Sequence, residues 1–264
     1  MNKKRLSISL VIPAYNEDNH IGRCLESVAG QSIRPSEVIV VDNNSTDKTR
    51  AVAEKYSFVR IITEAKQGII FARRAGFNAA KGDIIGSLDA DAVLPNNWVE
   101  HISDFFDAKP KEDVAWTSGA RFYNVRLPKF VSAVYNFLIF DINRLLIGQY
   151  TLWGSSMAIT KSQWLRMKSG LCARTDIHED LDLAIHFHEE GVRIFYDRRV
   201  RVKALLRGAR AGHQDLWEYL QWWPNTLRIH HKKAWPIVWF FGAVVVYCLT
   251  PYFSISDKLA KLLK

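Results

Sequence analysis

The chain has 264 residues, 48% of them hydrophobic, and carries a formal net charge of +9 at pH 7. This apolar content is enough for a full core, and the length allows one large α/β domain or a domain with an appendage. The positive charge suits an anionic partner. Because no DNA- or RNA-binding motif accompanies it, we expect a lipid surface and no nucleic acid. The three cysteines are widely spaced and predict neither a disulfide framework nor a metal site, which fits a reducing compartment.

The first part of the chain alternates short apolar runs with helical patterns. The basic N-terminus precedes an apolar run over residues 6–13 with no small-residue cleavage site after it, so we expect a first strand rather than a signal peptide. A helix capped by Asp18 or Asn19 follows and runs to about residue 29. We then expect strands at 37–41, 59–62 and 84–88, with helices from about 46 and over 69–80. This alternation with short connections predicts a parallel sheet with helices around it.

Polar side chains follow the expected strands at their carboxyl ends: Asn16 and Glu17, then Asp42 and Asn43, then Asp89 and Asp91. In such sheets these ends share one rim, where ligands bind. Asp89 and Asp91 repel each other unless a cation joins them, and Mg²⁺ uses one or two carboxylates together with substrate phosphates. We therefore predict a metal–diphosphate site, since no glycine-rich dinucleotide or P-loop signature is present. The alternative is a polar loop with helix caps, and for Asp42 the two interpretations are balanced.

Beyond residue 95 the pattern is less regular. We expect a helix to about residue 106, a strand over 113–118, and a strongly apolar helix over 130–147 that is buried or faces a membrane above the site. A Gly/Ser turn at 154–156 then leads into a short strand. Trp153, beside this turn, is interpreted as a core tryptophan in preference to a platform that stacks on a sugar ring.

A second acidic cluster occupies residues 175–183. Apolar residues at helical spacing follow it, so we expect a helix to begin near Glu179, with acids in its first turn favoured by the helix dipole. A carboxylate there stays ionised and can act as a general base towards a hydroxyl group. The dipole explains one or two acids easily, but less well why Asp180 and Asp182 both interrupt the apolar face. His178 is interpreted as structural or exposed rather than as a metal ligand.

Five segments in this order resemble the motif set of glycosyltransferase family 2: PAYNE at 13–17, VDNNSTD at 41–47, Gly68 with Ala72-Arg73, Asp89-Ala90-Asp91, and Glu179-Asp180. The resemblance covers about residues 5–205. It implies the GT-A fold, an α/β architecture in which helices flank a mixed sheet. It also implies a nucleotide-diphosphate sugar as donor and Mg²⁺ or Mn²⁺ as cofactor.

The resemblance further implies roles for individual residues. The donor would be bound by Pro13, Tyr15, Glu17, Asp42, Asn43, Gly68, Arg73, Asp89 and Ala90. Asp91 would hold the metal together with Asp89, and Asp180 would be the catalytic base. On the acceptor side we expect Trp153, Gly154, Ser155 and Glu179, and His213 is a further candidate metal ligand. The implied reaction is a single displacement with inversion, in which the cation neutralises the leaving diphosphate.

The expected acceptor is a hydroxyl group of a lipid-linked glycan, a lipid or a precursor of a cell-surface polysaccharide. The Q/RxxRW signature of processive members is absent, residues 221–223 being a fragment of it, so we expect single transfers. One alternative is a polyprenyl-phosphate glycosyltransferase, although an ionised phosphate acceptor needs no general base. Another is a catalytically inert membrane protein that binds nucleotide-sugar, although both acidic motifs are intact.

Residues 234–253 contain no charged side chain and reach the length of a helix that spans a bilayer. We predict a transmembrane or membrane-embedded helix there, followed by a basic amphipathic tail over 254–264. The glycosyltransferase domain is expected over 1–230, with a nucleotide-binding half at 1–95 and an acceptor half at 96–230. Because nucleotide sugars are cytoplasmic, we expect a cytoplasmic catalytic domain that is associated with membrane lipids.

Overall fold

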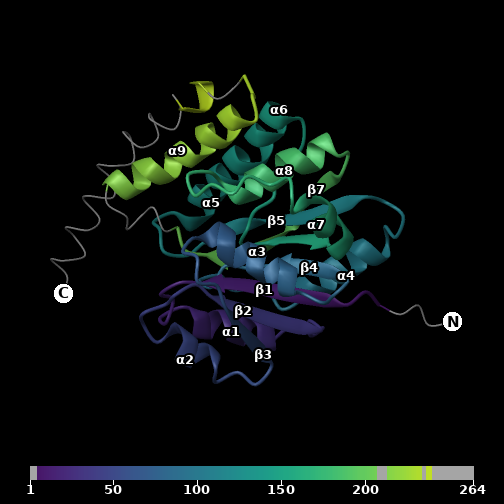
Figure 1. The fold of residues 1–264 in the computed structure, drawn as a ribbon, viewed down its shortest axis with the longest axis vertical. Helices are drawn as coiled ribbons and strands as arrows, with labels where there is room; N and C mark the ends of the chain where they lie inside the picture. The colour runs from purple at the N-terminus through teal and green to yellow at the C-terminus, as the bar shows by residue number, and fades with distance from the viewer. Residues whose placement is uncertain (1–4, 207–212, 234–235, 240–264) are drawn as a thin grey trace.

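The computed structural model describes residues 5–206, 213–233 and 236–239. A seven-stranded sheet in the order β3-β2-β1-β4-β6-β5-β7 forms its centre. The strands are β1 (Ile8–Ala14), β2 (Glu37–Asp42), β3 (Val59–Thr63), β4 (Ile84–Ser87), β5 (Val114–Phe122), β6 (Met157–Thr160) and β7 (Arg193–Ala204). The helices are α1 (Ile21–Ala29), α2 (Thr49–Ala53), α3 (Ile69–Ala79), α4 (Trp98–Asp107), α5 (Pro128–Asn136), η1 (Phe137–Ile142), α6 (Asn143–Ile147), α7 (Lys161–Met167), α8 (Glu179–Glu189) and α9 (His213–Ile229). In Figure 1, α1 and α2 lie with β2 and β3 at the lower end, and α5, α6, α8 and α9 lie at the upper end.

The sheet is parallel in its first half and mixed as a whole. β1 pairs in parallel with β2 and β4, and β2 pairs in parallel with β3, so the carboxyl ends of these strands meet at one rim. β6 enters between β4 and β5 and is antiparallel to both, while β7 is parallel to β5. The expected parallel sheet therefore holds for β1–β4, and the mixed sheet confirms the fold class that the family resemblance implied.

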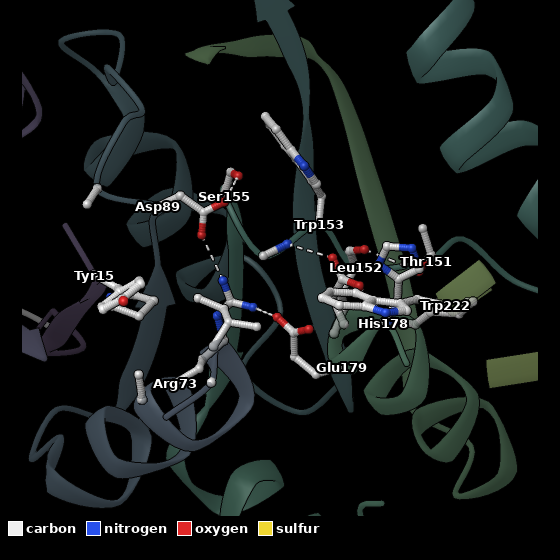
Figure 2. Close-up of a pocket in the computed structure, with 18 of the residues that line it drawn as sticks. Tyr15, Arg73, Asp89, Thr151, Leu152, Trp153, Ser155, His178, Glu179 and Trp222 are labelled. Carbon is white, nitrogen blue, oxygen red and sulfur yellow. Dashed lines mark hydrogen bonds and ion pairs between the residues drawn. The ribbon is translucent and has the colours of Figure 1, made fainter. Parts of the chain in front are cut away.

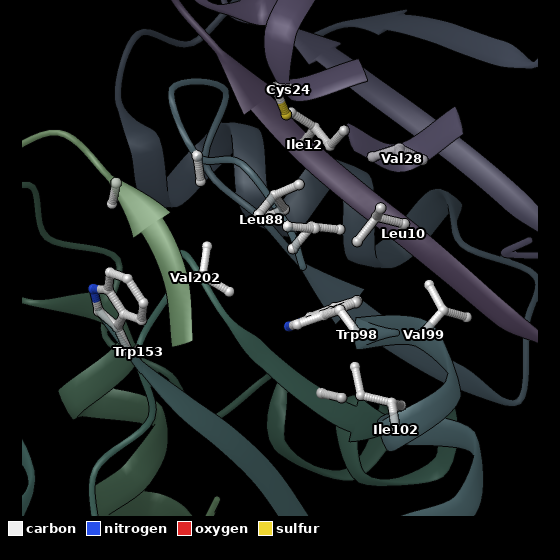
Figure 3. Close-up of a cluster of buried hydrophobic side chains, with 14 of the residues drawn as sticks. Leu10, Ile12, Cys24, Val28, Leu88, Trp98, Val99, Ile102, Trp153 and Val202 are labelled. Carbon is white, nitrogen blue, oxygen red and sulfur yellow. The ribbon is translucent and has the colours of Figure 1, made fainter. Parts of the chain in front are cut away.

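The sheet is the middle of three layers, since helices cover both of its faces and bury the side chains of β1 on each side. Alternate side chains of a strand point to opposite faces. Leu10 and Ile12 of β1 accordingly pack in one cluster with Val28 of α1 and Trp98 of α4, as Figure 3 shows. Val11 points the other way, into a second cluster that includes side chains of α3, α7 and α8.

A glycine determines how closely α3 lies on the sheet. A Cβ atom added to Gly76 would lie 2.2 Å from Cγ1 of Val11 and 2.9 Å from Cγ2 of Val41, so only a residue without a side chain fits there. The same helix carries Arg73 one turn earlier. The close contact therefore fixes the helix that presents Arg73 near the carboxyl ends of β1 and β4.

The predicted cap of the first helix is wrong. α1 begins at Ile21, and the side chain of Asn19 donates to Asp18 (2.6 Å) instead of capping it. The carbonyl oxygen of Glu17 accepts from the N–H groups of His20 and Ile21 instead, both at 2.9 Å. Other boundaries also shift, since α2 begins at 49 rather than 46 and β5 runs to 122 rather than 118.

The apolar segment expected over 130–147 forms a helical stretch of 20 residues, Pro128–Ile147, that includes the π-helical turns of η1. By length and composition it could cross a membrane, and 28% of its most apolar window is buried. Several large apolar side chains on or beside it are exposed: Leu127, Phe130, Val134, Phe137 and Leu145. The transmembrane helix predicted at 234–253 and the tail at 254–264 lie outside the described residues, apart from 236–239.

Candidate active site

A cavity of about 480 Å³ lies at the carboxyl ends of β1, β2 and β4. Its wall combines the rim of the sheet, the start of α3, the loop before β6, the start of α8, and α9 (Figure 2). The predicted site residues that line it are Pro13, Tyr15, Glu17, Asn43, Gly68, Arg73, Asp89, Ala90, Trp153, Gly154, Ser155, Glu179 and Asp180. The structure therefore brings residues from all five sequence motifs to one place.

The side chain of His213, a candidate metal ligand, lies outside the part of the chain that the structure describes. Among the other predicted site residues, two do not line this cavity. Asp42 and Asp91 are buried, with 6% and 5% of their surface exposed. Oδ1 of Asp42 accepts from the backbone N–H of Ser45 at 3.2 Å and closes its own loop. It does not cap α2, which begins only at Thr49. The contact of Asp42 with the donor and the contact of Asp91 with the metal stay predictions.

Arg73 connects the two acidic motifs inside the cavity. Its Nη2 lies 2.8 Å from Oδ1 of Asp89, and its Nη1 donates to Glu179 at the start of α8 (Figure 2). The second oxygen of Asp89 accepts a hydrogen bond from the hydroxyl of Ser155. Arg73 is only 5% exposed and its two carboxylate partners are partly buried, so these contacts form a network that holds the β4 loop, α3 and α8 in one arrangement.

Gly154 is required by the position of Arg73. A Cβ atom at this residue would lie 2.6 Å from Nη1 of the guanidinium group. Its backbone N–H points to the other acidic motif and donates to Oδ2 of Asp180 at 3.0 Å. The glycine therefore lets the loop before β6 pass between the arginine and the predicted base.

The carboxylate of Asp180 is oriented by two backbone groups. Oδ2 accepts from Gly154, and Oδ1 accepts from the N–H of Leu181 at 2.8 Å. A carboxylate can accept about four hydrogen bonds, so acceptor capacity remains on the cavity side. Asp180 thus has a fixed orientation and can still receive a proton from a ligand.

His178 lies on the cavity wall and contacts α9. Burial lowers the pKa of its imidazole, an effect that the nearby carboxylate of Asp180 opposes. Its backbone N–H donates to Oγ1 of Thr226 at 3.0 Å, and its ring meets the ring of Trp222 edge-on at 5.8 Å between centroids. These contacts agree with the interpretation of His178 as a structural residue.

Trp153 is 7% exposed and belongs to the hydrophobic core, as predicted, and it also lines the cavity. The sequence interpretation assigned no role in the site to other lining residues, among them Tyr135, Ile139, Asn143, Thr151, Leu152, Trp222 and Trp223. Trp223 is held by a 2.9 Å hydrogen bond from Nε1 to Oδ1 of Asn143. The partial match to the processive signature at 221–223 was the available signal for the two tryptophans of α9.

The charged residues that line the cavity, within the described part of the chain, are Glu17, Asp89, Glu179, Asp180 and Arg73. The single arginine is already paired with two of the carboxylates. A diphosphate would therefore meet an excess of negative charge unless a cation accompanied it. Burial, together with the charges of Asp91, Asp89 and Glu17, raises the pKa of the Cys24 thiol well above its usual value, so these acids add to the negative charge beside the rim of the sheet. Hard carboxylate oxygens in this arrangement fit Mg²⁺ or Mn²⁺.

Comparisons with known proteins agree with this arrangement. The model of the family "Glycosyl transferase family 2" matches residues 9–169. The glycosyltransferase AglE of Haloferax volcanii is 36% identical over 100 residues, which are 35% of this chain and 33% of that protein. A chondroitin synthase of Escherichia coli is 39% identical over 103 residues, 38% of this chain and 15% of that protein. The matches thus span a third or less of the length of these relatives.

Solved structures extend the similarity to the whole fold. The mannosyltransferase PcManGT of Pyrobaculum calidifontis, in complex with GDP-Man and Mn²⁺, has a TM-score of 0.66 and 21% identity, covering 98% of this chain and 81% of that chain. Staphylococcus aureus TarS (residues 1–349), in complex with UDP-GlcNAc, has a TM-score of 0.58 and 17% identity, covering 84% of this chain and 66% of that chain. The chain therefore belongs to glycosyltransferase family 2 and has the GT-A fold.

Proposed function

We propose that this chain is a metal-dependent, inverting glycosyltransferase that moves a sugar from a nucleotide-diphosphate donor to a hydroxyl group. The observation that carries the proposal is that Asp89 and Asp180 line one cavity and are connected through Arg73 and Glu179. A diphosphate at one acidic motif and a base at the other leave space for the sugar between them. The two functions that the reaction needs thus belong to one site.

The donor side consists of the rim of the sheet. Tyr15 is 48% exposed at the cavity wall, where an aromatic ring can stack on a nucleobase. Asp89, with Asp91 and Glu17 nearby, would hold Mg²⁺ or Mn²⁺, which when bound stabilises the charge that develops on the leaving diphosphate. The complex of PcManGT with GDP-Man and Mn²⁺ supports this combination of ligands for the fold.

The acceptor side is formed by the start of α8 and the loop before β6. Asp180 removes the proton of an acceptor hydroxyl, and the oxygen attacks the anomeric carbon on the face opposite the diphosphate, which inverts its configuration. Glu179 is engaged with Arg73, so it positions the guanidinium group and leaves the role of base to its neighbour. A polyprenyl-phosphate acceptor is less well supported, because an ionised phosphate oxygen would meet the carboxylate of Asp180.

A lipid-linked acceptor is supported by the helical segment Pro128–Ile147. Tyr135, Ile139 and Asn143, one turn apart, line the cavity. Phe130 and Phe137 of the same segment are exposed by 66% and 54%. One face of the segment thus borders the site while another presents apolar side chains to the outside, as a helix at the cytoplasmic membrane surface would. We propose that the acceptor reaches the cavity from the bilayer along this segment.

The experiment measures release of nucleoside diphosphate from UDP-, GDP- and dTDP-sugars with water as the acceptor, with Mn²⁺ or EDTA. We expect the enzyme to hydrolyse sugars of one nucleotide class when Mn²⁺ is present, and none when EDTA removes the metal. A donor at about 100 times its dissociation constant should also stabilise the fold by about 2.7 kcal/mol. Asp180→Asn should lower turnover by about 10²- to 10⁴-fold while donor affinity remains unchanged.

The matched control is Asp176→Asn, which changes a partly exposed aspartate paired with Arg174 four residues before the predicted base. It should keep normal turnover. Full activity of Asp180→Asn would reject the proposed base, and donor binding that is equally tight in EDTA would reject the metal.

A further inference from the structure

Four side chains of the types that bind transition metals gather beside α8, outside the cavity. They are Cys172, Asp182, His186 and His230, whose candidate ligand atoms all lie within 4.8 Å of one another. They come from three separate segments, namely the loop between α7 and α8, helix α8 itself, and the turn that follows α9. Because residues two apart on a helix point about 200° apart, Asp182 lies on a different side of α8 from Asp180.

Asp182 is the centre of the cluster. Its side chain is 1% exposed, its Oδ1 lies 2.8 Å from Nε2 of His230, and its Oδ2 accepts from the backbone N–H of Cys172 at 3.1 Å. His186 follows at the i+4 position, so the carboxylate and imidazole share one face of α8. This spacing lets two side chains of one helix turn towards a common point.

His186 has an unsatisfied atom that faces the cluster. Its Nε2 is buried and has no hydrogen-bond partner among the described residues, and it lies 3.8 Å from Oδ1 of Asp182. Its ring stands nearly perpendicular to that of His230, with 5.0 Å between centroids. Buried polar atoms normally have a partner, and an ion bound by this imidazole nitrogen would supply one.

We propose that these four side chains form a structural zinc site. A thiolate, two imidazoles and a carboxylate are ligands that Zn²⁺ accepts, whereas Mg²⁺ and Ca²⁺ prefer oxygen alone. Tetrahedral bonds of about 2.0–2.3 Å place ligand atoms about 3.3–3.8 Å apart. The candidate atoms lie within 4.8 Å of one another, with Oδ1 of Asp182 2.8 Å from Nε2 of His230 and 3.8 Å from Nε2 of His186, so small shifts of the side chains would admit the ion. Four protein ligands leave no open position, which is the pattern of a structural rather than a catalytic zinc.

The zinc would attach the end of α9 to α8. His230 follows the helix that carries Trp222 and Trp223 on the cavity wall, and Asp182 belongs to the helix that begins at Glu179. Zinc in this place would hold the tryptophans and the acidic pair in one arrangement without touching the substrate. The proposal is independent of the proposed function, because neither the ligands nor the test involves a donor or an acceptor.

The test begins with the full-length protein, purified with zinc in the medium and dialysed against a mild chelator. Elemental analysis should find about one zinc per chain. Cys172→Ser and His186→Gln should each lower the retained zinc by about tenfold or more. The matched control is His188→Gln, which changes an exposed histidine of the same helix and should retain zinc.

Cobalt substitution tests for a thiolate ligand in the wild type itself, so this readout does not depend on whether a variant folds. Co²⁺ added to the zinc-free wild type should give the visible bands of a tetrahedral site and a thiolate-to-cobalt charge-transfer band, and His188→Gln should keep both. Asp91→Asn should leave the zinc content unchanged, which separates this site from the proposed Mg²⁺ or Mn²⁺ site. Wild type without bound zinc, or a charge-transfer band that Cys172→Ser retains, would overturn the proposal.

Discussion

The guanidinium group of Arg73 lies 2.8 Å from the carboxylate of Asp89, although one belongs to α3 and the other to the loop after β4. The same arginine donates to Glu179, the first residue of α8. One buried cation therefore fixes the distance between the acidic motif at the rim of the sheet and the acidic motif of α8. The geometry of the proposed reaction depends on this distance, since donor and base come from different motifs.

Replacing Arg73 should affect both stability and activity. Arg73→Met leaves two partly buried carboxylates without their partner, so we expect the free energy of unfolding to fall by about 3 kcal/mol. Turnover of the nucleotide sugar should fall as well, because α8 loses its connection to Asp89. Urea denaturation and nucleoside diphosphate release measure the two effects.

Arg50→Met is the control for the stability effect. Arg50 pairs with Glu54 on the surface of α2, where both side chains are about half exposed. Its replacement should cost less than about 1 kcal/mol. Equal losses in the two variants would mean that the Arg73 network does not stabilise the fold.

The contact between α3 and the sheet predicts a cost for a single methyl group. Gly76→Ala should lower the free energy of unfolding by about 2 kcal/mol, since the new Cβ would lie 2.2 Å from Cγ1 of Val11. This loss should appear although alanine is the better helix former. Gly30→Ala is the control, because its Cβ would meet its nearest neighbour at 3.5 Å. Unchanged stability of Gly76→Ala would show that the helix can move away from the strand.

The strands and the rim of acidic side chains could be predicted because each depends on local sequence. An apolar run such as 37–41 forms a buried strand, and a parallel arrangement brings strand ends such as Asn43 and Asp89 together. The direction of a side chain in the following loop depends on that loop's own hydrogen bonds. This is why Asp42, which closes its loop on Ser45, could not be separated in advance from residues that line the cavity.

Contacts between distant segments were not accessible from sequence patterns. Asn143 binds Trp223 across 80 positions of the chain, and Cys172 reaches His230 only because α9 packs beside α8. Cysteine spacing predicted no metal ligand set, since three of the four candidate ligands are not cysteines. The antiparallel insertion of β6 between β4 and β5 likewise follows from the packing of the whole domain.

Stability should depend on pH through Asp197, which is buried on β7. Burial alone would raise the pKa of this carboxyl, but hydrogen bonds from the side chain and backbone of Arg199 outweigh it and leave the pKa below its usual value. Such a group stabilises the folded state above the unfolded pKa of about 3.9, and the contribution is lost as the pH falls through the folded-state value. Asp197→Asn should therefore destabilise the protein more at pH 7 than at about pH 3, as measured by urea denaturation.

Arg199→Met serves as the partner variant for this pH effect. It removes the side-chain donors to Asp197 and should reduce the same difference between neutral and acidic pH. A loss of stability in Asp197→Asn that is the same at both pH values would contradict the assignment.

The exposed apolar face of the segment Pro128–Ile147 predicts which side chains contact a membrane. Phe130 and Phe137 lie seven positions apart, on one face of a helix, and both are more than half exposed. Phe130→Asp combined with Phe137→Asp should lower binding to anionic phospholipid vesicles by about tenfold or more, because each aromatic ring loses its apolar burial. The matched control is Phe58→Asp, which changes an exposed phenylalanine before β3, beyond the other end of the sheet. If the double variant sediments with vesicles as well as the control does, this face does not contact the membrane, and the route proposed for a lipid-linked acceptor loses its support.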